Sequence, residues 1–161
     1  MCKVIFPDKR IQSFTYDDKG HILTVTDPLN ITFVKGEYDD KGRVIRQTIA
    51  NGEVYTYEYG ENETVIKTKS KNDEKKYIYD EYKNITKIIY NGKVIKENKF
   101  DIKRNLIYTK DRRGYELTNN YDENNNLIKQ VSSEGLEINA EYDEYNRRIR
   151  FYDNCGREEY Y

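Results

Sequence analysis

Histidine and cysteine, the side chains most often used in nucleophilic catalysis and zinc binding, are scarce in this sequence. His21 is the only histidine, so any Cys-His or Ser-His pair would have to use it. Cys2 and Cys155 stand at opposite ends of the sequence and form no CxxC pair, which argues against a disulfide framework and against a zinc site. No nucleophile elbow or P-loop occurs. The sequence therefore predicts no enzyme, with no catalytic residue, no metal site and no cofactor.

Recurring aspartates could suggest a calcium site. In an antiparallel sheet their equivalent positions would lie two strands apart, roughly 9.5 Å at about 4.8 Å per strand. Calcium takes its oxygen ligands at about 2.3–2.6 Å. We therefore expect each aspartate to bond to its own turn and not to share a metal. These residues are Asp17, Asp39, Asp80, Asp101, Asp122 and Asp143.

Each of these aspartates directly follows an aromatic residue. With Tyr59, which is followed by Gly60, the seven aromatics recur at steps of 22, 21, 20, 21, 21 and 21 residues. A turn containing Gly or Asn, an apolar pair and a second turn complete the unit. A fixed period indicates a supersecondary element that is stabilised by stacking on its neighbours. The repeat signature consists of Tyr16, Asp17, Gly20, Tyr38, Asp39, Gly42, Gly52, Tyr59, Tyr79, Asp80, Gly92, Phe100, Asp101, Gly114, Tyr121, Asp122, Gly135, Tyr142, Asp143 and Gly156.

Position in the repeat also explains the residues that could have been reactive. His21 follows a turn glycine, as Arg43 does in the next copy, so we interpret it as an ordinary strand-start side chain. Cys155 lies in a turn where other copies have Arg113 or Glu134, and we interpret it as an incidental thiol. The aromatic residues of the signature are expected to be scaffold that packs against the apolar pairs of adjoining strands.

Two turns and two strands per unit predict an all-β fold, a repetitive antiparallel hairpin meander without helix. We expect one domain over residues 1–161, with a half-unit at 1–15 and seven repeats over 16–161. The repeats give about fourteen strands, and such a long sheet is expected to curl or twist. In the turns at Lys83-Asn84 and Arg104-Asn105, the asparagine is expected to take the left-handed conformation that glycine takes elsewhere.

Composition excludes several classes of partner. Only 36% of residues are hydrophobic and 35% are charged, which would indicate disorder in a chain without repeats. The 28 basic and 29 acidic residues are interspersed, so we expect no one-signed field that would attract nucleic acid, although Lys and Tyr alternate at 75–79 as in a base-stacking platform. No apolar run suits a signal peptide or membrane insertion, so as encoded the chain is expected to be cytoplasmic.

The run Tyr38-Asp39-Asp40-Lys41-Gly42-Arg43-Val44-Ile45, followed by a Gly turn and Tyr-x-Tyr, resembles the YD repeat of the RHS family. Residues 27–30, Asp-Pro-Leu-Asn, resemble that family's Asp-Pro-Leu-Gly turn. The resemblance covers nearly the whole chain. It implies a β-sheet strip that, in large members, spirals into a hollow shell around a C-terminal toxin. This sequence differs in having seven units, no recognisable toxin domain and no match to the family's autoproteolytic closing segment.

The resemblance implies a non-enzymatic structural or binding module, part of or companion to an RHS-type polymorphic toxin or cell-surface protein. Its partners would be proteins: a toxin domain, neighbouring repeats or a second copy. Two alternatives stay open. One is a free-standing immunity or antitoxin protein that binds a toxin domain. The other is a carbohydrate-binding adhesin module with solvent-facing tyrosines. As part of an exported RHS system the chain would be extracellular.

The end of the sequence suggests a site for a partner. The next Tyr-Asp would fall at position 163, so the last residues are expected to form a strand without a following unit. An unpaired strand offers backbone groups for strand addition. We expect self-association or partner docking at the edge formed by Glu158, Glu159, Tyr160 and Tyr161.

Overall fold

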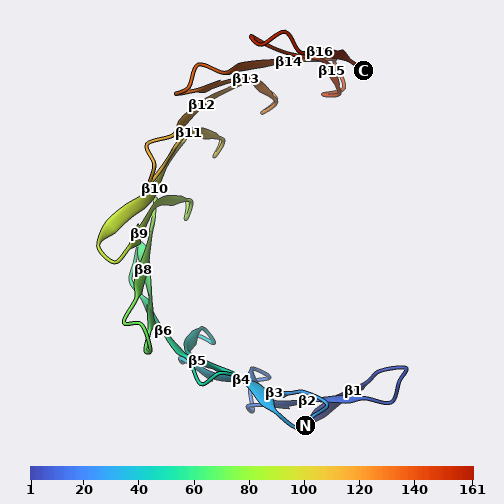
Figure 1. Ribbon diagram of the computed structural model, residues 1–161, viewed down its shortest axis with the longest axis vertical. Coiled ribbons are helices and arrows are strands. Elements are labelled where there is room, and N and C mark those ends of the chain that lie inside the picture. Colours follow the sequence, from blue (N-terminus) through green and yellow to red (C-terminus); the bar gives the residue numbers. More distant parts are fainter. The chain divides into compact units, whose positions relative to one another are not determined.

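The computed structural model describes all residues 1–161, and its regular elements are all β-strands (Figure 1). It has no helix that is long and apolar enough to cross a membrane. The strands are β1 (Cys2–Ile5), β2 (Ile11–Tyr16), β3 (Ile22–Thr26), β4 (Thr32–Tyr38), β5 (Val44–Ile49), β6 (Val54–Tyr59), β7 (Glu63–Thr68), β8 (Glu74–Tyr79), β9 (Ile85–Tyr90), β10 (Lys93–Phe100), β11 (Leu106–Asp111), β12 (Glu116–Tyr121), β13 (Leu127–Ser132), β14 (Glu137–Tyr142), β15 (Arg148–Asp153) and β16 (Glu158–Tyr160).

The sixteen strands follow one another in sheet order as they do in the sequence. This confirms the predicted all-β antiparallel meander without helix. The count exceeds the predicted fourteen by two, because the half-unit at residues 1–15 supplies β1 and β2 in addition to two strands from each of seven repeats. The chain divides into two compact units, residues 1–76 and 77–161, and each is described by itself.

Each repeat begins with a turn that its sequence explains. In the β4–β5 turn, the Gly42 N–H donates to the Asp39 carbonyl at 2.9 Å, and Gly42 has a φ of 76° that suits a residue without Cβ. In the four turns of this type that lack glycine, Lys83, Arg104, Asn125 and Asn146 take this conformation, with φ of 65°, 68°, 67° and 61°. The expectation that Asn84 and Asn105 would do so is wrong. Each asparagine lies one position later, where its side chain bonds to the turn aspartate.

A β-bulge follows most of these turns. In the β4–β5 pair, Glu37 lies opposite Arg46 but Tyr38 lies opposite Val44, so Ile45 is an extra residue in the strand. The same shift occurs in the β2–β3, β10–β11, β12–β13 and β14–β15 pairs. The β6–β7 pair has no shift, and this is the repeat that is one residue shorter in the sequence. The bulge is therefore absent from the one repeat that is shorter.

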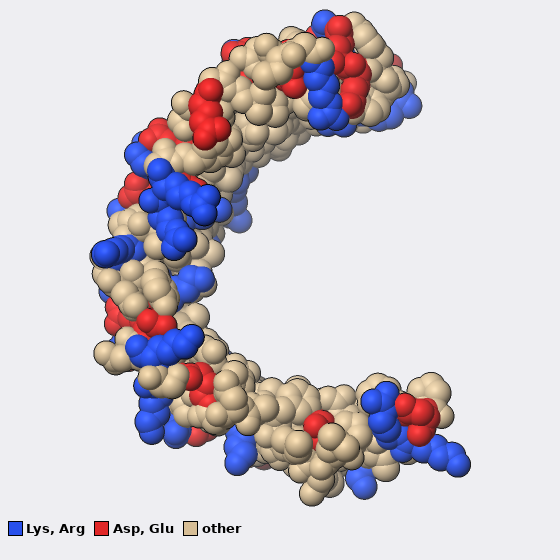
Figure 2. All heavy atoms as spheres, in the orientation of Figure 1, with Lys and Arg blue, Asp and Glu red and all other residues tan.

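Neither unit contains a conventional hydrophobic core. Val65, at 6% exposure, is the one buried apolar residue, and no side chain is fully buried. The strands form a single layer in which rings and aliphatic side chains cover one another only in part. Cross-strand ion pairs such as Glu58–Lys67 (2.7 Å) and Lys87–Glu97 (2.9 Å) lie on the surface, where positive and negative side chains occur in both units (Figure 2). Exposed pairs of this kind contribute little each, about 0–1 kcal/mol.

Candidate functional site

The aspartate of the Tyr-Asp pair closes its own turn. In the β4–β5 turn, Asp39 Oδ1 accepts backbone N–H groups of Lys41 (3.0 Å) and Arg43 (2.9 Å), and its Oδ2 accepts the Arg43 Nε–H at 2.8 Å. Where an asparagine replaces the arginine, its side-chain amide donates to the same oxygen, as Asn84 does to Asp80 at 2.9 Å. Both carboxylate oxygens are therefore used within one turn.

These contacts also fix the charge state of the turn aspartates. The backbone N–H and guanidinium of Arg43 lower the pKa of Asp39 below its ordinary value, because both stabilise the carboxylate. The pKa of Asp143 is lowered in the same way by Arg147. The side-chain amides of Asn84 and Asn126 lower the pKa of Asp80 and Asp122. None of these carboxylates is prepared to act as a general base near neutral pH.

Four of the six signature tyrosines bond to the backbone of the preceding repeat. Tyr59 donates its hydroxyl to the Val44 carbonyl at 2.7 Å, and Tyr38 donates to the Ile22 carbonyl at 2.8 Å. Each accepting residue lies at a bulge, where the ladder of backbone hydrogen bonds is interrupted. Tyr121 and Tyr142 contact Leu106 and Leu127 in the same way, at 3.2 Å. The tyrosine hydroxyl thus supplies a donor to a carbonyl that the bulge exposes.

The repeat whose aromatic is Phe100 uses another donor. Phenylalanine has no hydroxyl, and Asn98, two residues earlier on β10, donates its side-chain amide to the Ile85 carbonyl at 2.8 Å. Sequence reasoning missed Asn98 and its equivalent Asn119, which donates to the Leu106 carbonyl at 2.7 Å. A signal was present, because these asparagines stand where other repeats have the first tyrosine of Tyr-x-Tyr. However, the asparagines can be recognised as donors only when the strand register is known, and the apolar pairs of the sequence do not give that register.

Neighbouring repeats also touch one another through their turns. His21 bonds Asp17 at 2.7 Å and stacks on the Tyr38 ring with centroids 4.7 Å apart. The Arg43 guanidinium lies 4.3 Å from the centroid of Tyr59 in the equivalent place. In the second unit asparagines make the contact directly, as Asn105 does with Asn125 at 2.9 Å. His21 therefore serves as a turn and stacking residue.

The two cysteines form no disulfide. Cys2 and Cys155 are both free and exposed. No group of three or more His, Cys, Asp or Glu side chains is arranged to hold a metal ion.

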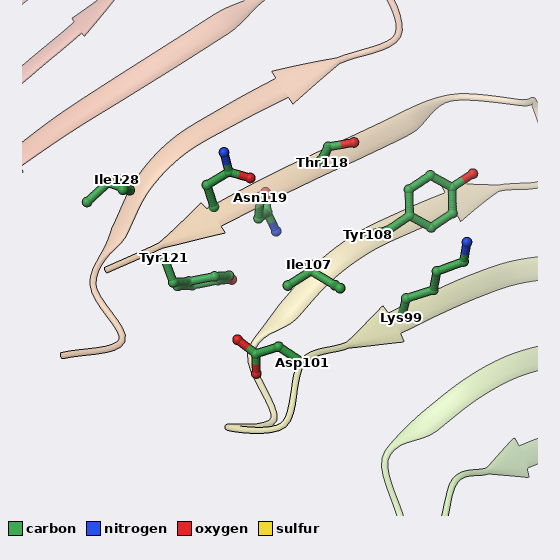
Figure 3. Close-up of a pocket in the computed structure, with 9 residues that line it drawn as sticks. Lys99, Asp101, Ile107, Tyr108, Thr118, Asn119, Tyr121 and Ile128 are labelled. Carbon is green, nitrogen blue, oxygen red and sulfur yellow. The ribbon is translucent and has the colours of Figure 1, made fainter. Parts of the chain in front are cut away.

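A shallow groove of about 610 Å³ lies on the second unit between β10 and β13 (Figure 3). Lys99 and Tyr108 lie next to one another at one end of it, and Tyr121 and Ile128 at the other. Most of its polar groups already have partners. Lys99 lies 5.1 Å from the centroid of Tyr108, Asp101 is held by its turn, and Asn119, only 6% exposed, accepts a bond from Gln130 at 2.9 Å. The groove contains no pair of a nucleophile and a base.

The predicted partner edge forms a short strand. β16 pairs with β15, and Arg150 contacts Glu158 at 2.7 Å and Glu141 at 2.8 Å. Glu159 pairs with Arg157 at 2.6 Å and accepts the hydroxyl of Tyr161 at 2.7 Å. Tyr160 and Tyr161 are exposed. The four residues are thus brought together, but their charged groups bond within the chain.

Residues 38–72 match the family model described as RHS Repeat. No curated protein matches the sequence. Several solved structures share the fold, among them TcdB2-TccC3 without its hypervariable C-terminal region, with a TM-score of 0.61 at 11% identity over 94% of this chain. The TcdB2-TccC3-TEV structure gives 0.52 at 14% over 89%, and a Photorhabdus luminescens Tc holotoxin pore with mutated TccC3 gives 0.53 at 13% over 91%. This chain spans only 10–12% of the length of those chains.

Proposed function

From the match of residues 38–72 to the RHS Repeat model and the shared fold, we propose that the chain is a non-enzymatic structural module of an RHS-type toxin system, a piece of sheet that holds or accompanies a protein partner. The observation that carries this proposal is the use of the motif itself. The aspartate, tyrosine and asparagine side chains of the repeat are engaged in closing turns and in joining one repeat to the next. Residues used in this way position strands and leave little for chemistry.

The fold supports the toxin context. Strips with this architecture occur within the TcdB2-TccC3 structures, and the share of this chain that they match is high. This chain spans about a tenth of the length of those chains. We therefore propose, and do not infer from the fold alone, that it works as part of a larger toxin assembly. In that role the repeats would form part of the wall of a shell, and the partner would be a protein segment bound along the sheet.

The carbohydrate alternative finds less support. Sugar stacking needs exposed ring faces, and Tyr82 and Tyr145 are exposed at turn tips. However, the Arg104 guanidinium lies 5.3 Å from the Tyr82 centroid, and the Arg147 guanidinium lies 5.1 Å from the Tyr145 centroid. The two rings are thus already stacked with cations from the same sheet.

The test is expression with a toxin domain encoded next to this sequence, either downstream in the same reading frame or in a separate neighbouring gene. For a wall module, protection of the host cell and a stable complex should require the toxin domain in the same polypeptide. An immunity protein would protect equally well when supplied as a separate chain. Protection from a separate chain would therefore contradict the proposal, and so would a toxic activity of this chain alone.

A further inference from the structure

Charges in the second unit are unevenly distributed along the chain, although the overall balance is near neutral. Residues 77–113 carry ten basic and five acidic residues, whereas residues 114–161 carry five basic and eleven acidic residues. Figure 2 shows Lys and Arg side chains gathered over the region of β9 to β11. The expectation of evenly interspersed charge is therefore wrong for this unit. A local positive field of this kind attracts acidic partners.

A groove of about 430 Å³ lies within the basic part. Its apolar lining comes from Val94, which is 43% exposed, and from Ile95, both on β10. Its cationic lining includes Lys96 on β10 and the adjacent Arg112 and Arg113 in the β11–β12 turn. An apolar strip bordered by cations suits a segment that is itself both apolar and acidic.

Three of the four cations that line this groove form no ion pair, whereas Glu97 and one carboxylate oxygen of Asp111 are already engaged. Glu97 pairs with Lys87 at 2.9 Å, and Asp111 Oδ1 accepts the backbone N–H of Arg113 at 2.8 Å. The Lys110 amine pairs with Glu116 at 2.6 Å, outside the set of free cations. The side chains of Lys96, Arg112 and Arg113 form no ion pair. The groove thus keeps an unneutralised positive charge.

The backbone is irregular at the same place. The β5–β6 hairpin has a three-residue turn, closed by the Ile49 N–H to the Glu53 carbonyl at 3.0 Å. In the β9–β10 hairpin the turn is only two residues, because Tyr90 pairs with Lys93, and Ile95 becomes a bulge within β10. A bulge changes the direction of nearby side chains and often lies beside a binding site. The departure from the repeat therefore occurs where the apolar strip is formed.

The β11–β12 turn holds the arginines on a fixed support. Asp111 Oδ1 accepts the backbone N–H groups of Arg113 and Tyr115 at 2.8 Å and 3.1 Å, so the turn is closed independently of the arginine side chains. Arg guanidinium groups bind carboxylates with two parallel hydrogen bonds, and a preformed turn reduces the entropy cost of binding.

We propose that this groove, lined by Val94, Ile95, Lys96, Arg112 and Arg113, binds an acidic, partly apolar segment of a protein partner. Carboxylates of the segment would bond to the arginines, and its apolar side chains would lie on Val94 and Ile95. A nucleic acid fits less well, because Glu97 and Asp111 line the same groove and would repel a continuous row of phosphates. The inference rests on the proposed role as a protein-binding module, since it names the chemistry of the segment bound.

The test is fluorescence anisotropy with the full chain and a short labelled peptide in which Glu alternates with Val. A peptide with Gln in place of Glu and a single-stranded oligonucleotide of equal length are the comparison probes. The variant Arg112→Ser/Arg113→Glu gives the turn the residues that the next repeat has at Ser133 and Glu134, so the turn should still form. We expect it to weaken binding of the Glu peptide by about a hundredfold, about tenfold for each arginine–carboxylate pair that is removed.

The matched control is Lys19→Ala/Lys41→Ala, which removes two turn-tip cations of the first unit and should leave binding unchanged. Thermal unfolding of both variants checks that the fold persists. Equal binding of the Glu and Gln peptides, tighter binding of the oligonucleotide, or an equal weakening in the control would each overturn the proposal. The measurement uses no toxin domain, so a failure here differs from a failure of the co-expression test, which concerns the module's place in a toxin system.

Discussion

Two hairpins of the first unit differ in the turn that closes them, and the difference explains what the repeat is built to do. The β4–β5 hairpin has an Asp-anchored turn, a bulge at Ile45 and a Val44 carbonyl that receives the Tyr59 hydroxyl. The β6–β7 hairpin has neither Asp turn nor bulge, and it closes by the Gly60 N–H to the Glu63 carbonyl at 2.9 Å. Both hairpins form, so the Asp turn and bulge are not needed for strand pairing. They serve to connect one repeat to the next.

The largest expected effect is the removal of a ring that joins the two hairpins. Tyr59 on β6 contacts Arg43 with its ring and Val44 with its hydroxyl. Tyr59→Ala should destabilise the chain by about 2 kcal/mol, less than the roughly 3–5 kcal/mol of fully buried aromatics, because the ring is half-buried. Urea unfolding followed by circular dichroism measures this. Tyr59→Phe, which removes only the hydroxyl bond, should cost about 1 kcal/mol. Equal costs for the two variants would show that the ring contributes nothing.

The need for a side-chain donor to the carbonyl of the preceding repeat can also be tested in the second unit. There Phe100 has no hydroxyl, and Asn98 donates to the Ile85 carbonyl. Asn98→Ala should cost about 1–2 kcal/mol, because the Ile85 carbonyl and the Thr109 hydroxyl are both left without this partner. Adding Phe100→Tyr should recover part of the stability by supplying the hydroxyl that Tyr38 and Tyr59 supply elsewhere. Chemical unfolding of the single and double variants measures the recovery. A double variant no more stable than Asn98→Ala would show that the Ile85 carbonyl does not need such a donor.

A smaller effect is expected on the pH dependence of stability, to which the Asp-anchored turns should contribute and the β6–β7 turn, which lacks Asp, should not. The folded pKa of Asp39 is lowered from 3.8, so its contribution is present above the unfolded pKa and is lost as pH falls through the folded pKa. Stability should therefore decline below about pH 4. Asp39→Asn keeps an acceptor for the turn N–H groups but cannot titrate, so its urea midpoint should change less between pH 7 and pH 3. An unchanged pH dependence would show that this turn contributes no linkage.

The smallest effect is expected from giving the β6–β7 hairpin the Asp-anchored turn and bulge of the β4–β5 hairpin. Replacing residues 60–63 with the six-residue sequence Asp-Asp-Lys-Gly-Arg-Val of residues 39–44 should introduce a bulge at the start of β7 and stabilise the chain by a few tenths of a kcal/mol to about 1 kcal/mol. Hydrogen exchange of the β6 and β7 amides would locate the gain. A permuted insert with the same composition is the control, since it lengthens the loop without placing Asp first.

The sequence was sufficient to predict the strands, their order and the aspartates and glycines of the turns, because each depends on local chemistry repeated about every 21 residues. It did not predict the bulges. Val44-Ile45 and Val65-Ile66 look alike as apolar pairs, and only the 20-residue step after Tyr59 distinguished them. The role of Asn98 followed from the position of the Ile85 carbonyl and could not be predicted before the register was known. Counting from Gly42 by the repeat would have placed Lys83 and Arg104 in the left-handed conformation, since they occupy the same turn position.

The scarcity of buried apolar side chains has a thermal consequence. Unfolding normally raises the heat capacity by about 12–15 cal/mol/K per residue, mainly because apolar surface becomes hydrated. In this protein most rings and aliphatic groups are already partly hydrated in the folded sheet, and Val65 is the one apolar residue that is buried. The increase should therefore be smaller per residue, and the curve of stability against temperature flatter. The maximum free energy of unfolding of such a sheet should therefore be modest, but this free energy should change little with temperature.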